Sequence, residues 1–154
     1  MLHEMRRKER EIGKGDIERI LQENRYGILS SISEDGMPYG VPVSYFYEAD
    51  KIYFHSALVG HKIDNLQHSP QVSFCVVGHT QVLPDKFSTE YESVIAFGTA
   101  GRLEGAEKEK ALHALVLKYA PAFDAKGQTY IAAAKEKVCV YCIDIAHMTG
   151  KARK

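Results

Sequence analysis

Short runs of β-branched and aromatic residues, separated by turn residues, constrain the fold of this chain more than any other feature. The turn residues Glu34-Asp35-Gly36 divide the first two runs, and Glu48-Ala49-Asp50 divide the second from the third. Connections this short join antiparallel strands, because a parallel crossover needs about a dozen residues or more. Six strands are predicted, at residues 26–32, 38–47, 51–56, 72–77, 93–103 and 138–145.

Helical patterns are few and lie around these strands. Four short helices are predicted, at residues 16–24, between Gly60 and Pro70, at 106–119 and at 129–135. Asp16 is expected to cap the first helix, while residues 78–92 are predicted to form a long loop with one helical turn. A doubly wound sheet would alternate strands and helices throughout. The pattern therefore predicts a mainly β chain, one domain over residues 1–154, built as a six-stranded antiparallel barrel with peripheral helices.

Composition argues against several function classes. The chain has 20 basic and 20 acidic residues, whereas a nucleic-acid-binding protein usually carries a basic excess. No apolar run approaches the roughly 20 residues of a membrane span, and no signal-peptide segment opens the chain, so a cytoplasmic protein is expected. Cys139 and Cys142 are three residues apart in a strand-like run, where their thiols would face opposite ways. Neither a redox pair nor a metal site is expected.

The segment from Phe54 to Leu66 carries the most chemical information. A strand delivers the hydroxyl of Ser56 to its end, a loop with Gly60 follows, and His61 and Lys62 then open a helix. A helix start offers free backbone N–H groups and the positive end of a dipole, so these parts together make an anion site suited to phosphate. An exposed lysine at an ordinary helix start explains the same spacing equally well.

Several short segments, taken in order, resemble one known family. They are Met5-Arg6-Arg7-Lys8, Val41-Pro42-Val43-Ser44-Tyr45, residues 53–66, Val72-Ser73-Phe74-Cys75-Val76, Ser93-Val94-Ile95-Ala96-Phe97-Gly98 and Thr149-Gly150-Lys151. Their order and spacing resemble the FMN-binding split-barrel family related to pyridoxamine phosphate oxidase. Within that family, the chain is most similar to the 5-nitroimidazole-resistance (Nim-type) proteins.

The resemblance implies a homodimer that holds FMN in a groove between its subunits. It places the flavin ring along the second strand, at Val41, Pro42, Val43, Ser44 and Tyr45. A proline in this strand also indicates an edge, a bulge or a face where a ligand docks, because proline donates no ladder hydrogen bond.

The resemblance also implies roles for residues outside that strand. His55 and Ser56 match positions that contact the ribityl chain and the phosphate, and His61 and Lys62 match a basic pair that binds the phosphate. The remaining two residues that it assigns to the cofactor site, both reaching it from the partner subunit, are Ser93 and Lys151.

The implied activity is FMN-dependent reduction of a small organic molecule, with a nitroimidazole or other nitroaromatic as the favoured substrate. The further basic residues with which the oxidase binds its phosphorylated vitamin have no identifiable counterparts, so vitamin B6 oxidation is not expected. His55 is the candidate general acid, and a structural hydrogen bond to the cofactor is an equal alternative. A non-catalytic flavin store or redox sensor is the rival function. Haem binding, through His55, His79 or His147, is the least favoured.

Overall fold

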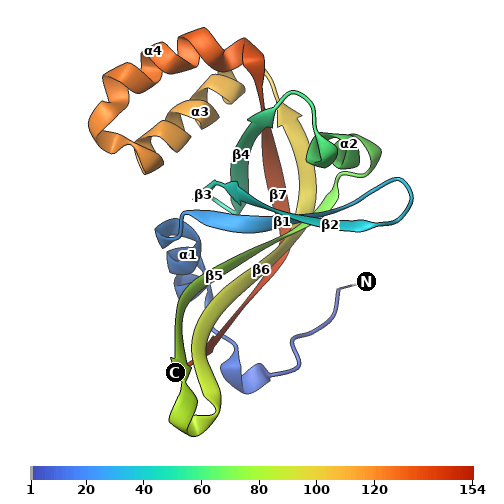
Figure 1. Cartoon of the computed structure of the whole chain (residues 1–154), viewed down its shortest axis with the longest axis vertical. Coiled ribbons are helices and arrows are strands. Elements are labelled where there is room, and N and C mark those ends of the chain that lie inside the picture. The colour runs from blue at the N-terminus through green and yellow to red at the C-terminus, as the bar shows by residue number, and fades with distance from the viewer. Residues whose placement is uncertain (1) are drawn as a thin grey trace.

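The computed structural model of the protein describes residues 2–154 and is mainly β (Figure 1). None of the helices in that part of the chain is long and apolar enough to cross a membrane. The strands are β1 (Tyr26–Ile32), β2 (Pro38–Ser44), β3 (Phe46–Glu48), β4 (Lys51–Ala57), β5 (Gln71–Leu83), β6 (Ser88–Leu103) and β7 (Val138–Arg153). The helices are α1 (Lys14–Glu23), α2 (His61–His68), α3 (Gly105–Tyr119) and α4 (Asp124–Ala134), with short 3-10 turns at Lys8–Arg10, Pro84–Lys86, Pro121–Phe123 and Lys135–Lys137.

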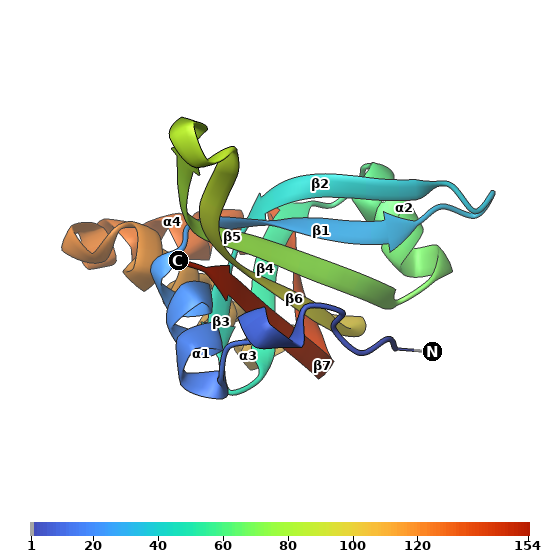
Figure 2. The same ribbon diagram turned by 90° about the horizontal axis from the view of Figure 1, so that it is seen from below.

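The strands form one antiparallel sheet in the order β2-β1-β5-β6-β7-β4-β3. Consecutive strands β2 and β3 lie at opposite edges of this sheet although only Tyr45 separates them. The sheet must therefore curl until its edges approach each other, and the strongly bent strands are visible from two sides (Figure 1, Figure 2). The inward side chains, including Leu29, Phe54, Phe74 and Val94, are fully buried and form the core. The predicted antiparallel β fold with peripheral helices is confirmed.

The prediction of six strands was wrong, because the segment expected as one strand over residues 38–47 is divided at Tyr45. The Tyr45 ring is fully buried, edge-on to Phe74 at 5.2 Å between centroids, and its hydroxyl donates to the Leu21 carbonyl. Its amide donates to the Tyr119 hydroxyl at 2.9 Å, and its carbonyl accepts from the Lys118 ammonium at 2.9 Å. A residue whose backbone groups bond to a helix cannot continue a strand ladder, so the structure has seven strands.

The prediction of a loop over residues 78–92 was also wrong. Strands β5 and β6 continue through this region as a two-stranded arm, paired from Thr80↔Tyr91 to Leu83↔Ser88. The pairing shifts between Val77 and Thr80, and the arm closes through a 3-10 turn after which Phe87 takes a left-handed conformation. Gly78 lies at the bulge and Pro84 lies in the hairpin turn, so both residues interrupt the strand pattern without ending the strand pair.

Three predicted boundaries shift in the structure. Strand β7 continues to Arg153, because its second half pairs with β6 along its length. Helix α4 begins at Asp124, earlier than predicted. Helix α1 begins at Lys14 with Gly13 at the N-cap, so Asp16 lies in the first turn and does not cap the helix.

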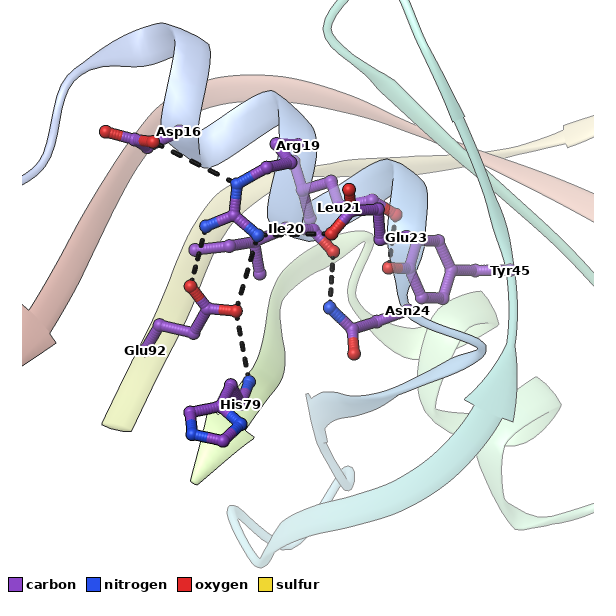
Figure 3. A network of polar contacts seen from close by, with 9 residues as sticks. All are labelled: Asp16, Arg19, Ile20, Leu21, Glu23, Asn24, Tyr45, His79 and Glu92. Carbon is purple, nitrogen blue, oxygen red and sulfur yellow. Dashed lines mark hydrogen bonds and ion pairs between the residues drawn. The ribbon is translucent and has the colours of Figure 1, made fainter. Parts of the chain in front are cut away.

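Helix α1 is held against the sheet by apolar burial and a polar network (Figure 3). Its Ile17, Ile20 and Leu21 side chains are buried in the main core. On the outside, the Arg19 guanidinium donates to the Glu92 carboxylate at 2.7 Å, and that carboxylate also accepts the His79 amide at 3.0 Å. The arginine lowers the pKa of Glu92, so this carboxylate stays ionised across the neutral range. The network joins α1 to the base of the β5–β6 arm.

We predict that Gly98→Ala destabilises the protein by about 1–3 kcal/mol, because overpacking at a closed site forces the backbone to shift. A Cβ at Gly98 would lie 2.2 Å from the Asp144 carbonyl oxygen, at the bulge between β6 and β7. Gly101→Ala in the same strand is the control, since nothing lies within 4 Å of its Cβ position. Urea unfolding measures both variants, and equal stability of the two would contradict the close approach.

Candidate functional site

The end of β4 and the start of α2 form a compact cationic site. Ser56 is buried at the end of β4, and the Lys62 ammonium donates to its hydroxyl at 2.5 Å. Gly60 makes the approach possible, since its φ of 147° lies in a region that side chains rarely adopt. The chain thereby turns directly from a strand into a helix, and Lys62 in the first helical turn reaches back to the strand.

The N-terminus of α2 faces the same region without a side-chain cap. The Asp64 amide is the donor of the hydrogen bond to the Gly60 carbonyl at 3.0 Å. Three backbone amides come before Asp64 in the helix, those of His61, Lys62 and Ile63. The first amides of a helix have no intrahelical partners. An ammonium, a hydroxyl and free helix amides are the donors that a phosphate group accepts from.

His61 lies at the same helix start but is held by the β1–β2 hairpin. Its Nε2 atom is 2.9 Å from the Ser33 hydroxyl, and its ring packs on Tyr39 with 3.9 Å between centroids. The structure therefore brings His61 and Lys62 to one helix turn. The β1–β2 hairpin orients His61, whereas Ser56 of β4 orients Lys62. Nothing in the sequence pairs His61 with Ser33 or Tyr39, because both partners lie more than 20 residues away.

A buried amide fixes α2 to the sheet. The Asn65 side chain donates to the Ser31 hydroxyl at 3.0 Å, and each residue is only 2% exposed. This contact was not predicted, although the sequence carries a signal for it. Asn65 lies between the core residues Ile63 and Leu66, and a polar side chain among core positions needs a hydrogen-bonding partner.

His55 lies on the outer side of β4, one residue before Ser56. Its side chain reaches solvent, yet burial by the surrounding protein lowers its pKa, and the nearby Lys62 charge lowers it further. The imidazole is therefore neutral at neutral pH. A neutral imidazole can donate or accept a hydrogen bond, but it does not carry the spare proton of a resting general acid.

The residues of the predicted flavin strand divide between two faces. Pro42 and Ser44 point outward from β2, whereas Val41 and Val43 pack toward the core. Strand β2 is an edge strand that pairs with β1, which explains how Pro42 is accommodated. Tyr45 stands apart, since its ring, amide and carbonyl are all engaged within the fold.

Ser93 and Lys151 form a second group, away from α2. They are paired neighbours on β6 and β7, near the end of β7 that carries the C-terminus, whereas α2 lies at the other end of the sheet in both views (Figure 1, Figure 2). The Lys151 ammonium lies 5.6 Å from the Tyr91 ring centroid, and Arg10 donates to the Tyr91 hydroxyl at 3.3 Å. One copy of the chain thus does not bring all the predicted site residues together.

The cysteines take the positions expected of separate buried residues. Cys139 is part of the main core, while Cys142 faces the groove beside α3, and both thiols are free. The prediction that the two thiols diverge is confirmed. Within residues 2–154, no group of three or more His, Cys, Asp and Glu side chains could hold a metal ion.

The sequence matches a family model described as pyridoxamine 5'-phosphate oxidase over residues 14–152. Among functionally curated proteins, none matches this chain.

Solved structures share the fold over nearly the whole chain. A candidate 5-nitroimidazole antibiotic resistance protein from Bacteroides thetaiotaomicron is 26% identical with a TM-score of 0.76, over 92% of this chain and 86% of that chain. A FAD-binding protein from Mesorhizobium loti is 25% identical with a TM-score of 0.67, over 94% and 98% of the two chains. A flavocytochrome from Azotobacter vinelandii, 21% identical with a TM-score of 0.82 over 99% and 73%, shares the fold.

We predict that Lys62→Gln raises the pKa of His55, because it removes one of the two causes that lower it. The pKa of His55 is lower in the folded protein than its value of about 6.5 in the unfolded chain. The neutral imidazole therefore contributes to folding stability above pH about 6.5, and this contribution is lost as the pH falls through the folded pKa. An NMR titration of the His55 ring measures the midpoint, and Lys126→Gln on the exposed side of α4 is the control. An unchanged midpoint in Lys62→Gln would contradict the coupling.

Proposed function

This chain belongs to the pyridoxamine 5'-phosphate oxidase family, and from that premise we propose that it is a homodimeric, FMN-dependent reductase of a small organic molecule. A nitroimidazole or related nitroaromatic is the substrate class that we propose. The observation that carries the proposal is the contact of Lys62 with Ser56 beside the open start of α2. This donor set fits the terminal phosphate of FMN, and two structural neighbours are described as a FAD-binding protein and a flavocytochrome.

The residues present fit an FMN molecule along the end of the sheet. Lys62, Ser56 and the α2 amides would hold its phosphate, and the free edge of β2 at Pro42 and Ser44 would flank its ring. When bound, the flavin supplies the electrons for reduction, while the protein binds the flavin, orients it and tunes the electrostatics around its ring. Because the imidazole is neutral, we assign His55 a hydrogen bond to the cofactor or substrate rather than the role of resting acid.

The outer face of the sheet supports the proposed homodimer. Tyr26, Val77, Ile95 and Phe97 expose 62%, 54%, 41% and 36% of their surface on this face. Large apolar side chains grouped on a sheet face mark an interaction surface. Ser93 points to the same side as Ile95 and Phe97, because alternate residues of a strand share a face. A second copy covering this face would receive Ser93 and Lys151 beside its own β2 and α2.

The substrate class is supported by similarity and by chemistry. The Bacteroides thetaiotaomicron neighbour, a candidate 5-nitroimidazole resistance protein, covers 92% of this chain. Reduction of a nitro group to a nitroso group takes up two electrons and two protons and releases water, so a flavin that delivers electron pairs suits it. The rival function is a flavin store or redox sensor, in which the flavin transfers no electrons to such a compound.

We predict that Lys62→Ala weakens FMN binding about tenfold to a hundredfold, because it removes a charge-assisted hydrogen bond to the phosphate. Riboflavin lacks the phosphate, so its affinity should change little. Fluorescence titration of the flavin-free protein with FMN, FAD and riboflavin makes the comparison, with Lys126→Ala as the control. Equal losses for FMN and riboflavin would place the phosphate elsewhere.

We predict that Phe97→Asp raises the dimer dissociation constant by at least about tenfold, since it would bury a charge within the proposed interface. Phe123→Asp is the matched control, because Phe123 is 58% exposed and lies in the turn between α3 and α4. Light scattering over a concentration series measures both variants. A monomeric parent protein that retains FMN fully would refute the shared site.

We predict that the reduced FMN-loaded protein is reoxidised faster by 2-methyl-5-nitroimidazole than by anaerobic buffer. Stopped-flow absorbance follows the flavin after photoreduction, and 2-methylimidazole, which lacks the nitro group, is the control. No acceleration across several nitroaromatics would favour the flavin store or sensor. The resting spectrum tests the cofactor itself, since a Soret band in place of flavin bands would indicate haem.

A further inference from the structure

Helices α3 and α4 leave a cavity of about 370 Å³ against the sheet, beside the ends of β2 and β4. Its sheet side is formed by Ser44 of β2 and His55 of β4. Its other walls are aliphatic side chains from the two helices and the start of β7: Leu112, Leu115, Val116, Ile131 and Val138.

The lining offers no free charge to a ligand. Its one lysine, Lys135, donates to the Glu109 carboxylate at 2.6 Å, so its charge is already paired with that of an acid. His55 is neutral at neutral pH, because burial and Lys62 lower its pKa. A charged ligand entering this space would lose its water without gaining a partner, which is costly. The occupant is therefore uncharged in the part that enters.

The residues at the rim of the cavity and the cavity volume indicate the kind and size of ligand that fits. Tyr119 and Tyr130 contribute aromatic rings to the lining, and Tyr130 is 66% exposed, which places it at the rim. Aromatic rings stack favourably on other flat rings. Ligand pockets span roughly 300–1,000 Å³, so a cavity at the lower end of that range suits one small ring system rather than a large cofactor.

The cavity is fixed relative to the end of β2. Tyr119, which lines it, accepts the Tyr45 amide at 2.9 Å, and the neighbouring Lys118 donates to the Tyr45 carbonyl at 2.9 Å. Tyr45 follows Ser44 directly in the chain. Helix α3, which forms one wall of the cavity, is therefore attached at the residue that follows β2, next to the proposed position of the flavin ring.

We propose that this cavity binds the uncharged aromatic ring of the substrate and directs its electron-accepting substituent toward Ser44 and His55. The proposal rests on the proposed function, because the β2 and β4 residues are the ones expected beside the flavin. It explains how this chain could discriminate against a phosphorylated vitamin, since the cavity lacks the free cations that a phosphate requires.

Binding of two matched probes tests the charge requirement. Calorimetry on the oxidised, FMN-loaded protein compares 4-nitrobenzyl alcohol, which is neutral, with 4-nitrobenzoate, which is an anion of similar shape. We expect the neutral probe to bind with one site per chain and the anion to bind at least about tenfold more weakly. Equal affinities would overturn the proposal.

Two substitutions in α4 test the location. Ala134 lines the cavity, whereas Ala133 is exposed on the same helix and does not. Ala134→Phe should fill the space and weaken the neutral probe at least about tenfold, while Ala133→Phe leaves it unchanged. FMN affinity should stay at the parent value in both variants. Unchanged probe binding in Ala134→Phe would overturn the proposal, and so would loss of FMN affinity, because the cavity would then hold the flavin.

A third variant tests the same location if Ala134→Phe does not fold. The chain has no tryptophan, so Tyr130→Trp places a single indole at the rim. Its emission should be quenched saturably by the neutral probe, and the anion should need at least about a tenfold higher concentration for the same quenching. Absence of saturable quenching by the neutral probe would overturn the proposal. Failure of the proposed function can be told apart from failure of the cavity proposal. If the proposed function is wrong, the parent protein binds no FMN, and the same probe titrations on flavin-free protein still test the cavity.

Discussion

Tyr45 joins two strands that lie at opposite edges of one sheet, and the rest of the structure depends on this one-residue connection. Because β2 ends and β3 begins on either side of it, the sheet has to curl until its edges approach. The side chain stabilises the curled form from inside, through its hydroxyl bond to Leu21 and its contact with Phe74. Its amide and carbonyl bond to α3, so the same residue also fixes the outer helices.

The curled sheet sets the geometry of the cationic site. It brings the β1–β2 hairpin close to α2, where Ser33 contacts His61 and Ser31 contacts Asn65. With the helix held from that side, the Lys62 ammonium bonds to Ser56 at the end of β4. The open helix start and the lysine then face one region, and this concentration of donors makes an anion the natural guest.

The sheet and the outer pair of helices, α3 and α4, provide two different kinds of binding surface. The sheet, its edge strand and the start of α2 are the parts we associate with cofactor binding and dimer formation. The cavity between α3, α4 and the strand ends is apolar and lacks a free charge. In a family named for an enzyme of a phosphorylated vitamin, such a cavity would suit the uncharged substrate that we propose.

The sequence by itself determined the local features: the turns between early strands, and the glycine loop between the strand that carries Ser56 and the helix that carries Lys62. Those features depend on residues close in the chain, where spacing alone sets geometry. For Pro42 the sequence left an edge, a bulge and a docking face open, and the sheet order decided for the edge. Tertiary structure alone decided the inward turn of Tyr45, the β5–β6 arm, the full length of β7 and the contact of His61 with Ser33. Each depends on a partner far along the chain, whose hydrogen bonds and packing override a weak local pattern.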